Sequence, residues 1–301
     1  MAKALDWRSI GVAVSKDESL GPIDWAELPA EIRVLRYEVP SGELAAIEAG
    51  NPANPCVILI PGVTGSKEDF QRMMPLFVEA GYFVISYDLA GQYESRDAGP
   101  WNRTPAQDRY TLDLYVDDLF AVLERHSGHP VHALGYSFGG NILQEAFSRE
   151  PQRFASLTFL SAPPIPGQAF RAVKRIGWIS RITNGRIGAA LMIWGVKSNV
   201  IPVPEDRLAF VRARFALTRV SSVADIISLM RRTPNHRRAL AEVSIPKLVA
   251  VGEHDLWPRS VHGDFAEAIG ARLAVYATGH SPCETTPHQL TRDMLEAIET
   301  N

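Results

Sequence analysis

The segment Gly135-Tyr136-Ser137-Phe138-Gly139 places a serine between two glycines. It follows an apolar run that predicts a buried strand over 131–135, and it precedes a helical pattern over 141–149. At a tight turn from strand to helix, the glycines relieve steric crowding and the serine Oγ rises above the edge of the sheet. The backbone N–H of Phe138 then points to where an oxyanion would develop. The pattern therefore predicts that Ser137 is a nucleophile.

A serine hydroxyl needs a base to remove its proton and a carboxylate to orient that base. Among eight histidines, His280 is the best candidate, because it follows Gly279 and a predicted strand over 272–277. His254 is the alternative. Asp255 follows a predicted strand that ends at Gly252, and Glu253 lies in the same loop. The order Ser137, Asp255, His280 along the chain is the order expected when this motif lies in an open parallel sheet.

The elements that would position these residues alternate between strand and helix. Residues 33–40 and 44–49 predict a hairpin turned at Ser41-Gly42. Further strands are predicted at 56–60, 82–87, 131–135, 156–160, 245–252 and 272–277, and helices at about 70–80, 111–124, 141–149, 261–269 and 287–299. Such alternation favours a mostly parallel sheet of about eight strands with helices on both faces.

The alternation stops between Pro163 and Val243, where the pattern is helical and no strand is convincing. We therefore expect a core built from residues 1–162 and 244–301, with a helical insertion at 163–243 between the sixth and seventh strands. The insertion has 14 Lys and Arg against 4 Asp and Glu, a net charge of +10 that leaves −13 for the rest of the chain. One explanation is that the two parts attract each other and that most of the charge is solvated.

Composition excludes several classes of protein. The chain has 301 residues, of which 46% are hydrophobic and 22% charged, with a net charge of −3. These values exclude a collagen, a coiled coil and a disordered tail, and they argue against a nucleic-acid binder. The two cysteines, Cys56 and Cys283, cannot form a disulfide framework. We expect a reducing, cytoplasmic location, because the first residues lack the form of a secretory signal and the apolar stretch 187–196 is too short to span a membrane.

Several of these segments together resemble the α/β-hydrolase superfamily. The resemblance covers nearly the whole chain except the first 30 or so residues and the insertion. It rests on the Ser137 motif and on four further segments: Leu59-Ile60-Pro61-Gly62-Val63-Thr64-Gly65, Asp88-Leu89-Ala90-Gly91-Gln92-Tyr93-Glu94-Ser95, Gly252-Glu253-His254-Asp255-Leu256-Trp257-Pro258 and Gly279-His280-Ser281. It implies the α/β-hydrolase fold with an inserted helical cap, the triad Ser137, Asp255 and His280, and oxyanion donors at the N–H groups of Val63 and Phe138.

Two departures from the family pattern matter for the site. Pro61-Gly62 stands where many relatives have His-Gly, which leaves the choice between Val63 and Thr64 as oxyanion donor open. Gln92-Tyr93-Glu94 replaces a second glycine after Gly91. The serine at the elbow argues against dehalogenase-like and epoxide-hydrolase-like activity, because those relatives place Asp there. As substrate contacts we expect Thr64, Tyr136, Trp178, Trp194 and Trp257.

The insertion offers a second explanation for its charge, in which some cations face the cleft and favour an anionic substrate. The candidates are Arg171, Lys174, Arg175, Arg207 and Arg212, and apolar residues of the insertion that could line the pocket include Phe170, Leu191, Met192 and Phe210.

The expected activity is cofactor-independent cleavage of an ester, lactone or thioester in a small molecule. A perhydrolase or haloperoxidase-like activity and a C–C bond hydrolase are alternatives that use the same triad. A non-catalytic receptor for a small ligand is an alternative of another class. We expect no metal, no nucleic-acid partner and no membrane span, and the sequence leaves self-association open.

Overall fold

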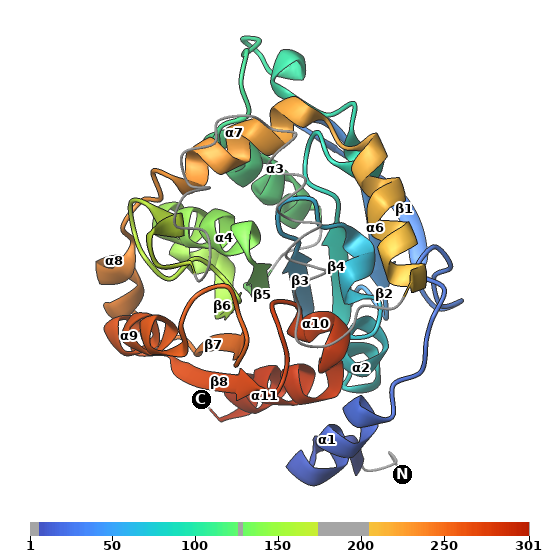
Figure 1. Cartoon of the computed structure of the whole chain (residues 1–301). Coiled ribbons are helices and arrows are strands. Elements are labelled where there is room, and N and C mark those ends of the chain that lie inside the picture. The colour runs from blue at the N-terminus through green and yellow to red at the C-terminus, as the bar shows by residue number, and fades with distance from the viewer. Residues whose placement is uncertain (1–5, 126–128, 174–204, 301) are drawn as a thin grey trace.

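The computed structural model describes residues 6–125, 129–173 and 205–300 of the chain (Figure 1). Its centre is an eight-stranded sheet in the order β1-β2-β4-β3-β5-β6-β7-β8. The hairpin of β1 (Arg33–Val39) and β2 (Gly42–Ala49) joins β4 (Phe83–Tyr87) in antiparallel pairing. From β4 onwards all neighbours are parallel, through β3 (Cys56–Ile60), β5 (Val131–Tyr136), β6 (Phe154–Leu160), β7 (Lys247–Gly252) and β8 (Arg272–Tyr276). The predicted mostly parallel sheet of about eight strands is confirmed.

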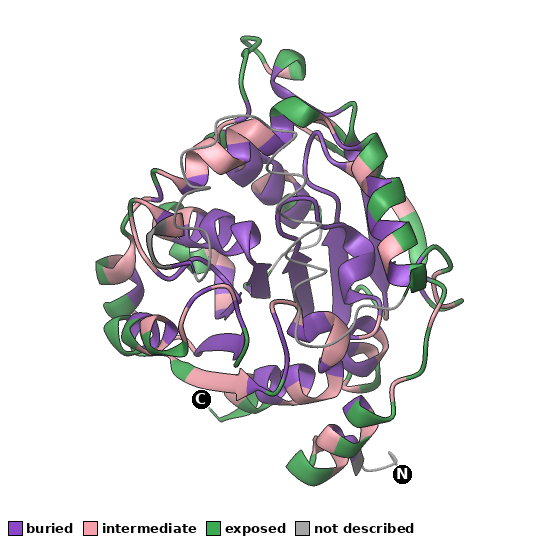
Figure 2. Cartoon of the chain, viewed as in Figure 1, coloured by how far each residue is buried: buried purple, intermediate pink, exposed green. Residues whose placement is uncertain are grey.

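The central strands β3 and β4 are buried at every position because both faces of the sheet are covered by helices, as Figure 2 shows. Successive side chains point to opposite faces. Ile58 and Ile60 belong to the core shared with α3 (Leu112–Glu124), α4 (Phe138–Arg149) and α9 (Arg259–Ile269). Val57 and Leu59 belong to the opposite core, with α2 (Met74–Glu79) and α11 (Pro287–Glu299).

Between β6 and β7 the described residues form α6 (Glu205–Leu217), α7 (Val220–Met230) and α8 (Arg237–Ala241), together with an isolated bridge that pairs Gly167 with Thr233. These helices agree with the helical pattern expected for 163–243. That this insertion forms a separate cap domain stays a prediction. In Figure 1, α6 and α7 run along the outside of the fold beside the carboxyl-end loops of the sheet.

The main differences from the sequence-based expectations lie at helix starts. The helix expected from residue 70 begins at Met74, because Ser66 and Asp69 cap a separate 3-10 turn over Lys67–Phe70. Helix α4 begins at Phe138, three residues earlier than expected, although Gly139 and Gly140 are poor helix formers. Close packing explains these glycines, since a Cβ on Gly140 would lie 2.4 Å from the Cβ of Ala162.

Two helices were not expected from the sequence. Helix α1 (Ile10–Glu18) packs against α11, and Asp17 of α1 accepts hydrogen bonds from the backbone N–H groups of His288 and Gln289 at the start of α11. The short helix α10 (Pro282–Thr285) follows His280. Within the described ranges, no helix has both the length and the apolar character to cross a lipid bilayer.

Candidate active site

Ser137 lies in a strained turn between the end of β5 and the start of α4. Its backbone has φ 50° and ψ −117°, outside the helical and extended regions, and its N–H donates to the carbonyl of Leu160 at 2.9 Å. Only glycine fits at the positions two residues before and two residues after Ser137. A Cβ on Gly135 would lie 2.5 Å from the Gly139 carbonyl oxygen, and one on Gly139 would lie 2.4 Å from the carbonyl oxygen of Ile60. A positive-φ serine held in this way is a common feature of sites that store backbone strain.

His280 and Asp255 come from the loops after the neighbouring strands β8 and β7. Their side chains meet at 2.7 Å between Nδ1 of His280 and Oδ1 of Asp255. The Asp255 residue is only 2% exposed. Burial alone would raise the pKa of this carboxyl, but the nearby imidazoles of His280 and His262 outweigh burial and hold the pKa well below its usual range. Asp255 is therefore ionised at neutral pH and orients His280 through Nδ1.

Ring packing places His280 beside the residue that precedes the serine. The rings of Tyr136 and His280 have centroids 5.4 Å apart, and the Tyr136 hydroxyl is 2.8 Å from Oγ of Ser281. Among the described residues, no hydrogen bond links the Ser137 hydroxyl to His280. This contact is commonly long in catalytic sites without substrate.

The loop after β3 passes directly beside Ser137. A Cβ added to Gly62 would lie 2.9 Å from the Ser137 Cβ and 3.5 Å from its Oγ, so glycine is required for the approach. The next residues are Val63 and Thr64, and Thr64 has a positive φ of 58°. Its backbone N–H donates to Oε1 of the buried Gln92 at 2.6 Å.

This hydrogen bond bears on the open choice of oxyanion donor. The Thr64 N–H already has an acceptor, whereas the N–H groups of Val63 and Phe138 have no protein acceptor within the described part of the chain. The geometry therefore favours Val63 over Thr64, and the assignment stays a prediction. Sequence reasoning noticed Gln92 only as a departure from the family pattern and missed its contact with this loop.

The other predicted substrate contacts have mixed outcomes. Trp178 and Trp194 lie outside the described residues, as do Lys174, Arg175, Leu191 and Met192. Trp257 is 1% exposed, donates its Nε1–H to the Ala169 carbonyl at 2.7 Å and packs against the rings of both His280 and His262. Substrate contact by Thr64, Tyr136 or Trp257 stays a prediction.

The alternative base and acid point elsewhere. The side chains of His254 and Glu253 are 44% and 49% exposed and face each other at 3.1 Å. Sequence reasoning missed His262, which it placed only in or beside a helix. The residue is fully buried on α9, and its Nε2 lies 3.4 Å from Oδ2 of Asp255. Its position seven residues after Asp255 carries no signal of this contact.

The cations of the insertion that the structure describes do not form one anion-binding group. Arg207 is buried, and its Nη2 is 2.7 Å from Oδ1 of Asp69 while its Nε is 2.8 Å from Oε2 of Glu284. Arg214 is buried beside it, bonded to the same oxygen of Asp69. Arg212 is exposed. Arg207 and Arg214 therefore hold α6 on the core, as expected if the two oppositely charged parts attract each other.

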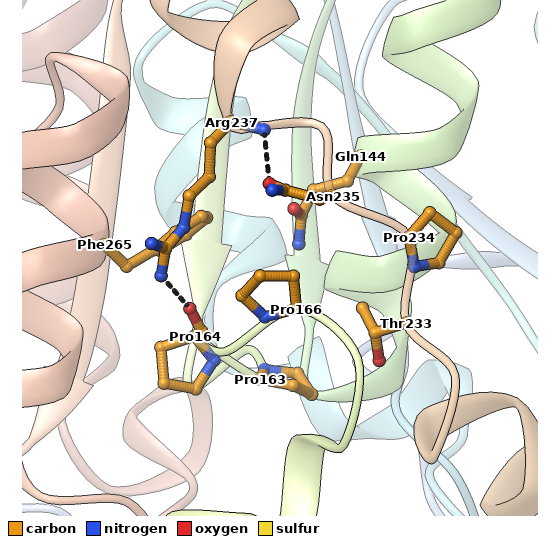
Figure 3. Close-up of a pocket in the computed structure, with 9 residues that line it drawn as sticks. All are labelled: Gln144, Pro163, Pro164, Pro166, Thr233, Pro234, Asn235, Arg237 and Phe265. Atoms are coloured by element: carbon orange, nitrogen blue, oxygen red, sulfur yellow. Dashed lines mark hydrogen bonds between the residues drawn. The ribbon is translucent and has the colours of Figure 1, made fainter.

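A small cavity lies away from Ser137, and Figure 3 shows it between Gln144 of α4, the prolines at 163, 164 and 166 and the segment from Thr233 to Arg237. Its volume of about 10 Å³ suits a single water molecule rather than a substrate. In the described ranges, no group of three or more His, Cys, Asp or Glu side chains is arranged to hold a metal ion. Cys56 and Cys283 are both buried and unpaired, and burial raises the pKa of both thiols.

Comparisons with known proteins agree with this architecture. Residues 55–182 match the family described as "alpha/beta hydrolase fold". The protein named "Probable oxidoreductase EphD" of Mycobacterium tuberculosis is 28% identical over 208 residues, which cover 66% of this chain and 34% of that protein. The chain thus spans about a third of the length of this curated relative. The "Putative non-heme haloperoxidase" of Mycobacterium phage D29 is 26% identical over 218 residues, covering 66% of this chain and 71% of that protein.

Among solved structures, a putative aryl esterase from Burkholderia cenocepacia superposes with a TM-score of 0.72 at 19% identity, covering 88% of this chain and 97% of that one. At this identity the likeness shows the fold alone. The family match over residues 55–182, the sheet order and the strand-to-helix turn at Ser137 point the same way: the chain has the α/β-hydrolase fold.

Proposed function

We propose that the protein is a serine hydrolase that cleaves an ester-like bond, namely an ester, lactone or thioester, in a small molecule. The observation that carries the proposal is the meeting of three features at one edge of the sheet. Ser137 occupies a strained turn after β5, His280 follows β8, and Asp255 after β7 holds Nδ1 of His280 at 2.7 Å. Parallel strands bring these loops to the same edge.

In the proposed mechanism, His280 Nε2 removes the proton of the Ser137 hydroxyl as Oγ attacks the substrate carbonyl carbon. The ionised Asp255 stabilises the imidazolium that forms. The N–H groups of Val63 and Phe138 donate to the carbonyl oxygen as it gains negative charge. His280 then gives its proton to the leaving group, and an acyl group remains on Ser137. Water, activated by His280, attacks the acyl carbon and restores the free serine.

The direct test is hydrolysis of p-nitrophenyl acetate by the wild-type protein and by Ser137→Ala. Loss of the nucleophile is expected to lower kcat by about 10⁶-fold, as in other triad enzymes. The matched control is Ser161→Ala, because Ser161 is likewise a buried serine with a positive φ, and it directly follows the neighbouring strand β6. Near-normal turnover by Ser137→Ala would refute the proposal.

A second candidate is peroxide-dependent halogenation through the same triad, which the similarity to the phage haloperoxidase favours. Here Ser137 would pass an acyl group to hydrogen peroxide instead of water, and the resulting peracid would oxidise halide. Bromination of phenol red that requires peroxide, a carboxylic acid and Ser137 would support this activity. Bromination that persists in Ser137→Ala would contradict it.

A further inference from the structure

The two carboxylate oxygens of Asp255 have unequal surroundings. Oδ1 accepts hydrogen bonds from Nδ1 of His280 and from the backbone N–H of Leu256. Oδ2 is buried and makes no hydrogen bond. A buried charged oxygen without a donor is costly, typically by about 1–3 kcal/mol or more. Something near Oδ2 is therefore expected to supply a donor.

His262 is the side chain beside this oxygen. It is 0% exposed, and neither of its ring nitrogens makes a hydrogen bond. Nε2 lies 3.4 Å from Oδ2, slightly beyond the usual range of about 2.7–3.2 Å for an N–H···O bond. A shift of a few tenths of an ångström would thus give a donor to Oδ2 and an acceptor to Nε2–H at the same time.

The Trp257 ring, the Asp255 carboxylate and the buried face of helix α9 surround His262. The ring of Trp257 stands edge-on to His262 at 6.1 Å and is also 6.1 Å from the His280 ring, so the three rings pack around Asp255. His280 and His262 are the two titratable groups that act on the Asp255 carboxyl. His262 also sits on α9, whose other buried residues Phe265, Ala266 and Ile269 fix the helix in the core.

We infer that His262 is a positioning residue that donates its Nε2–H to Oδ2 of Asp255 and so fixes the plane of the carboxylate that orients His280. This inference rests on the proposed function. His262 itself contacts neither the serine nor the substrate in this scheme. Without this donor, the carboxylate is held through Oδ1 alone, by His280 and the backbone N–H of Leu256, and its plane is less well fixed.

Two amide variants give the sharpest test. The amide nitrogen of His262→Gln reaches the position of Nε2, whereas that of His262→Asn reaches only the position of Nδ1. We expect His262→Asn to lower kcat on p-nitrophenyl acetate by about 10- to 100-fold with KM unchanged, by analogy with residues that orient the ligands of metal ions. His262→Gln is expected to stay within about threefold of wild type, and His262→Leu is expected to behave like His262→Asn.

The pH profile separates positioning from a purely structural role. Loss of the donor leaves more negative charge acting on His280, so the acidic limb of kcat/KM is expected to move to higher pH in His262→Asn and to stay in place in His262→Gln. The control is His288→Gln, because His288 is a histidine with little exposure whose Nδ1 lies 2.8 Å from Oδ1 of Asp17, away from the site. It is expected to lower the melting temperature without moving the acidic limb.

Two results would overturn the inference: equal kinetics and pH profiles for the Asn and Gln variants, or losses that follow melting temperature alone with an unmoved acidic limb. Failure of the proposed function would look different, because the wild-type protein itself would then not react at Ser137 with a fluorophosphonate probe. A labelled Ser137 together with indifferent His262 variants rejects the positioning role alone.

Discussion

Asp69 joins helix α6 to the loop after β3 that carries the candidate oxyanion donor Val63, and replacing Asp69 with Asn should loosen both the helix and the loop. Its Oδ1 accepts from Nη2 of Arg207 at 2.7 Å and from Nη1 of Arg214, and its Oδ2 accepts from the Ser66 N–H at 3.1 Å. Burial alone would raise the pKa of Asp69, but Arg214 and Arg207 outweigh burial and lower it. In Asn the amide oxygen can still accept from the Ser66 N–H, but the amide NH2 then faces the two arginines, so the substitution removes the charge and the acceptor that both guanidinium groups share.

The magnitude follows from the charges of the cluster. Arg207 and Arg214 are balanced by Asp69 and Glu284, so Asp69→Asn leaves one uncompensated positive charge in a buried place. Two guanidinium nitrogens bonded to one oxygen are at most about 5 Å apart, and at an effective dielectric constant of about 20 their repulsion is about 3 kcal/mol. Breaking a buried ion pair by removing one partner typically costs about 3–5 kcal/mol. We expect the free energy of unfolding to fall by that amount.

Urea unfolding followed by far-UV circular dichroism measures this loss. The double variant Asp69→Asn with Arg214→Met restores neutrality, so it should be more stable than Asp69→Asn alone. Because the folded-state pKa of Asp69 is lowered, its contribution is present above the unfolded pKa of about 4 and is lost as pH falls further. A loss below about 1 kcal/mol at pH 7, or a double variant less stable than the single one, would refute the reasoning.

Three further outcomes follow from buried polar contacts. Burial raises the pKa of Asp118 to about 7, so the stabilising contribution of its protonated carboxyl is lost as pH rises through 7, by at most about 1.4 kcal/mol per pH unit. Urea unfolding at pH 5 and 8 should therefore show a smaller loss of stability between these two pH values for Asp118→Asn than for the wild type, and an equal loss would contradict this. Asp17→Ala removes the acceptor at the start of α11 and should cost about 1–2 kcal/mol in thermal unfolding, an unchanged melting temperature being the contrary result. Gln92→Met removes the Gln92 acceptor of the Thr64 N–H and should lower kcat on p-nitrophenyl acetate about tenfold, since the lost hydrogen bond is worth about 1–3 kcal/mol. Unchanged kcat would exclude a role for Gln92 in shaping the loop after β3.

Much of the fold could be predicted from the sequence because its central strands are short, apolar and bounded by turn residues. Cys56–Ile60 is buried at all positions, as the run of five apolar residues predicts, and the helix over 287–299 has its predicted bounds. Helix α1 could not be predicted from the sequence, because it is only weakly amphipathic and is held by tertiary contacts from Asp17 to the start of α11. Such contacts between residues far apart in the chain leave no local pattern.

The candidate site likewise contains residues that could be predicted from the sequence and residues that could not. The Ser137 turn and the loops of Asp255 and His280 could be predicted, because glycines and strand ends mark them. The residues that support them could not: His262 reaches Asp255 from a helix, and Gln92 reaches Thr64 from the loop after β4. Arg207 was a candidate for anion binding, and only the structure shows that Asp69 and Glu284 already neutralise it.

The nature of the reactive residue is tested most directly by a fluorophosphonate probe followed by peptide mapping. We expect one covalent adduct on Ser137, absent from Ser137→Ala and formed much more slowly in His280→Gln. An adduct at another residue, or ester hydrolysis by a protein whose Ser137 remains unlabelled, would contradict the central claim that Ser137, activated by His280, is the nucleophile.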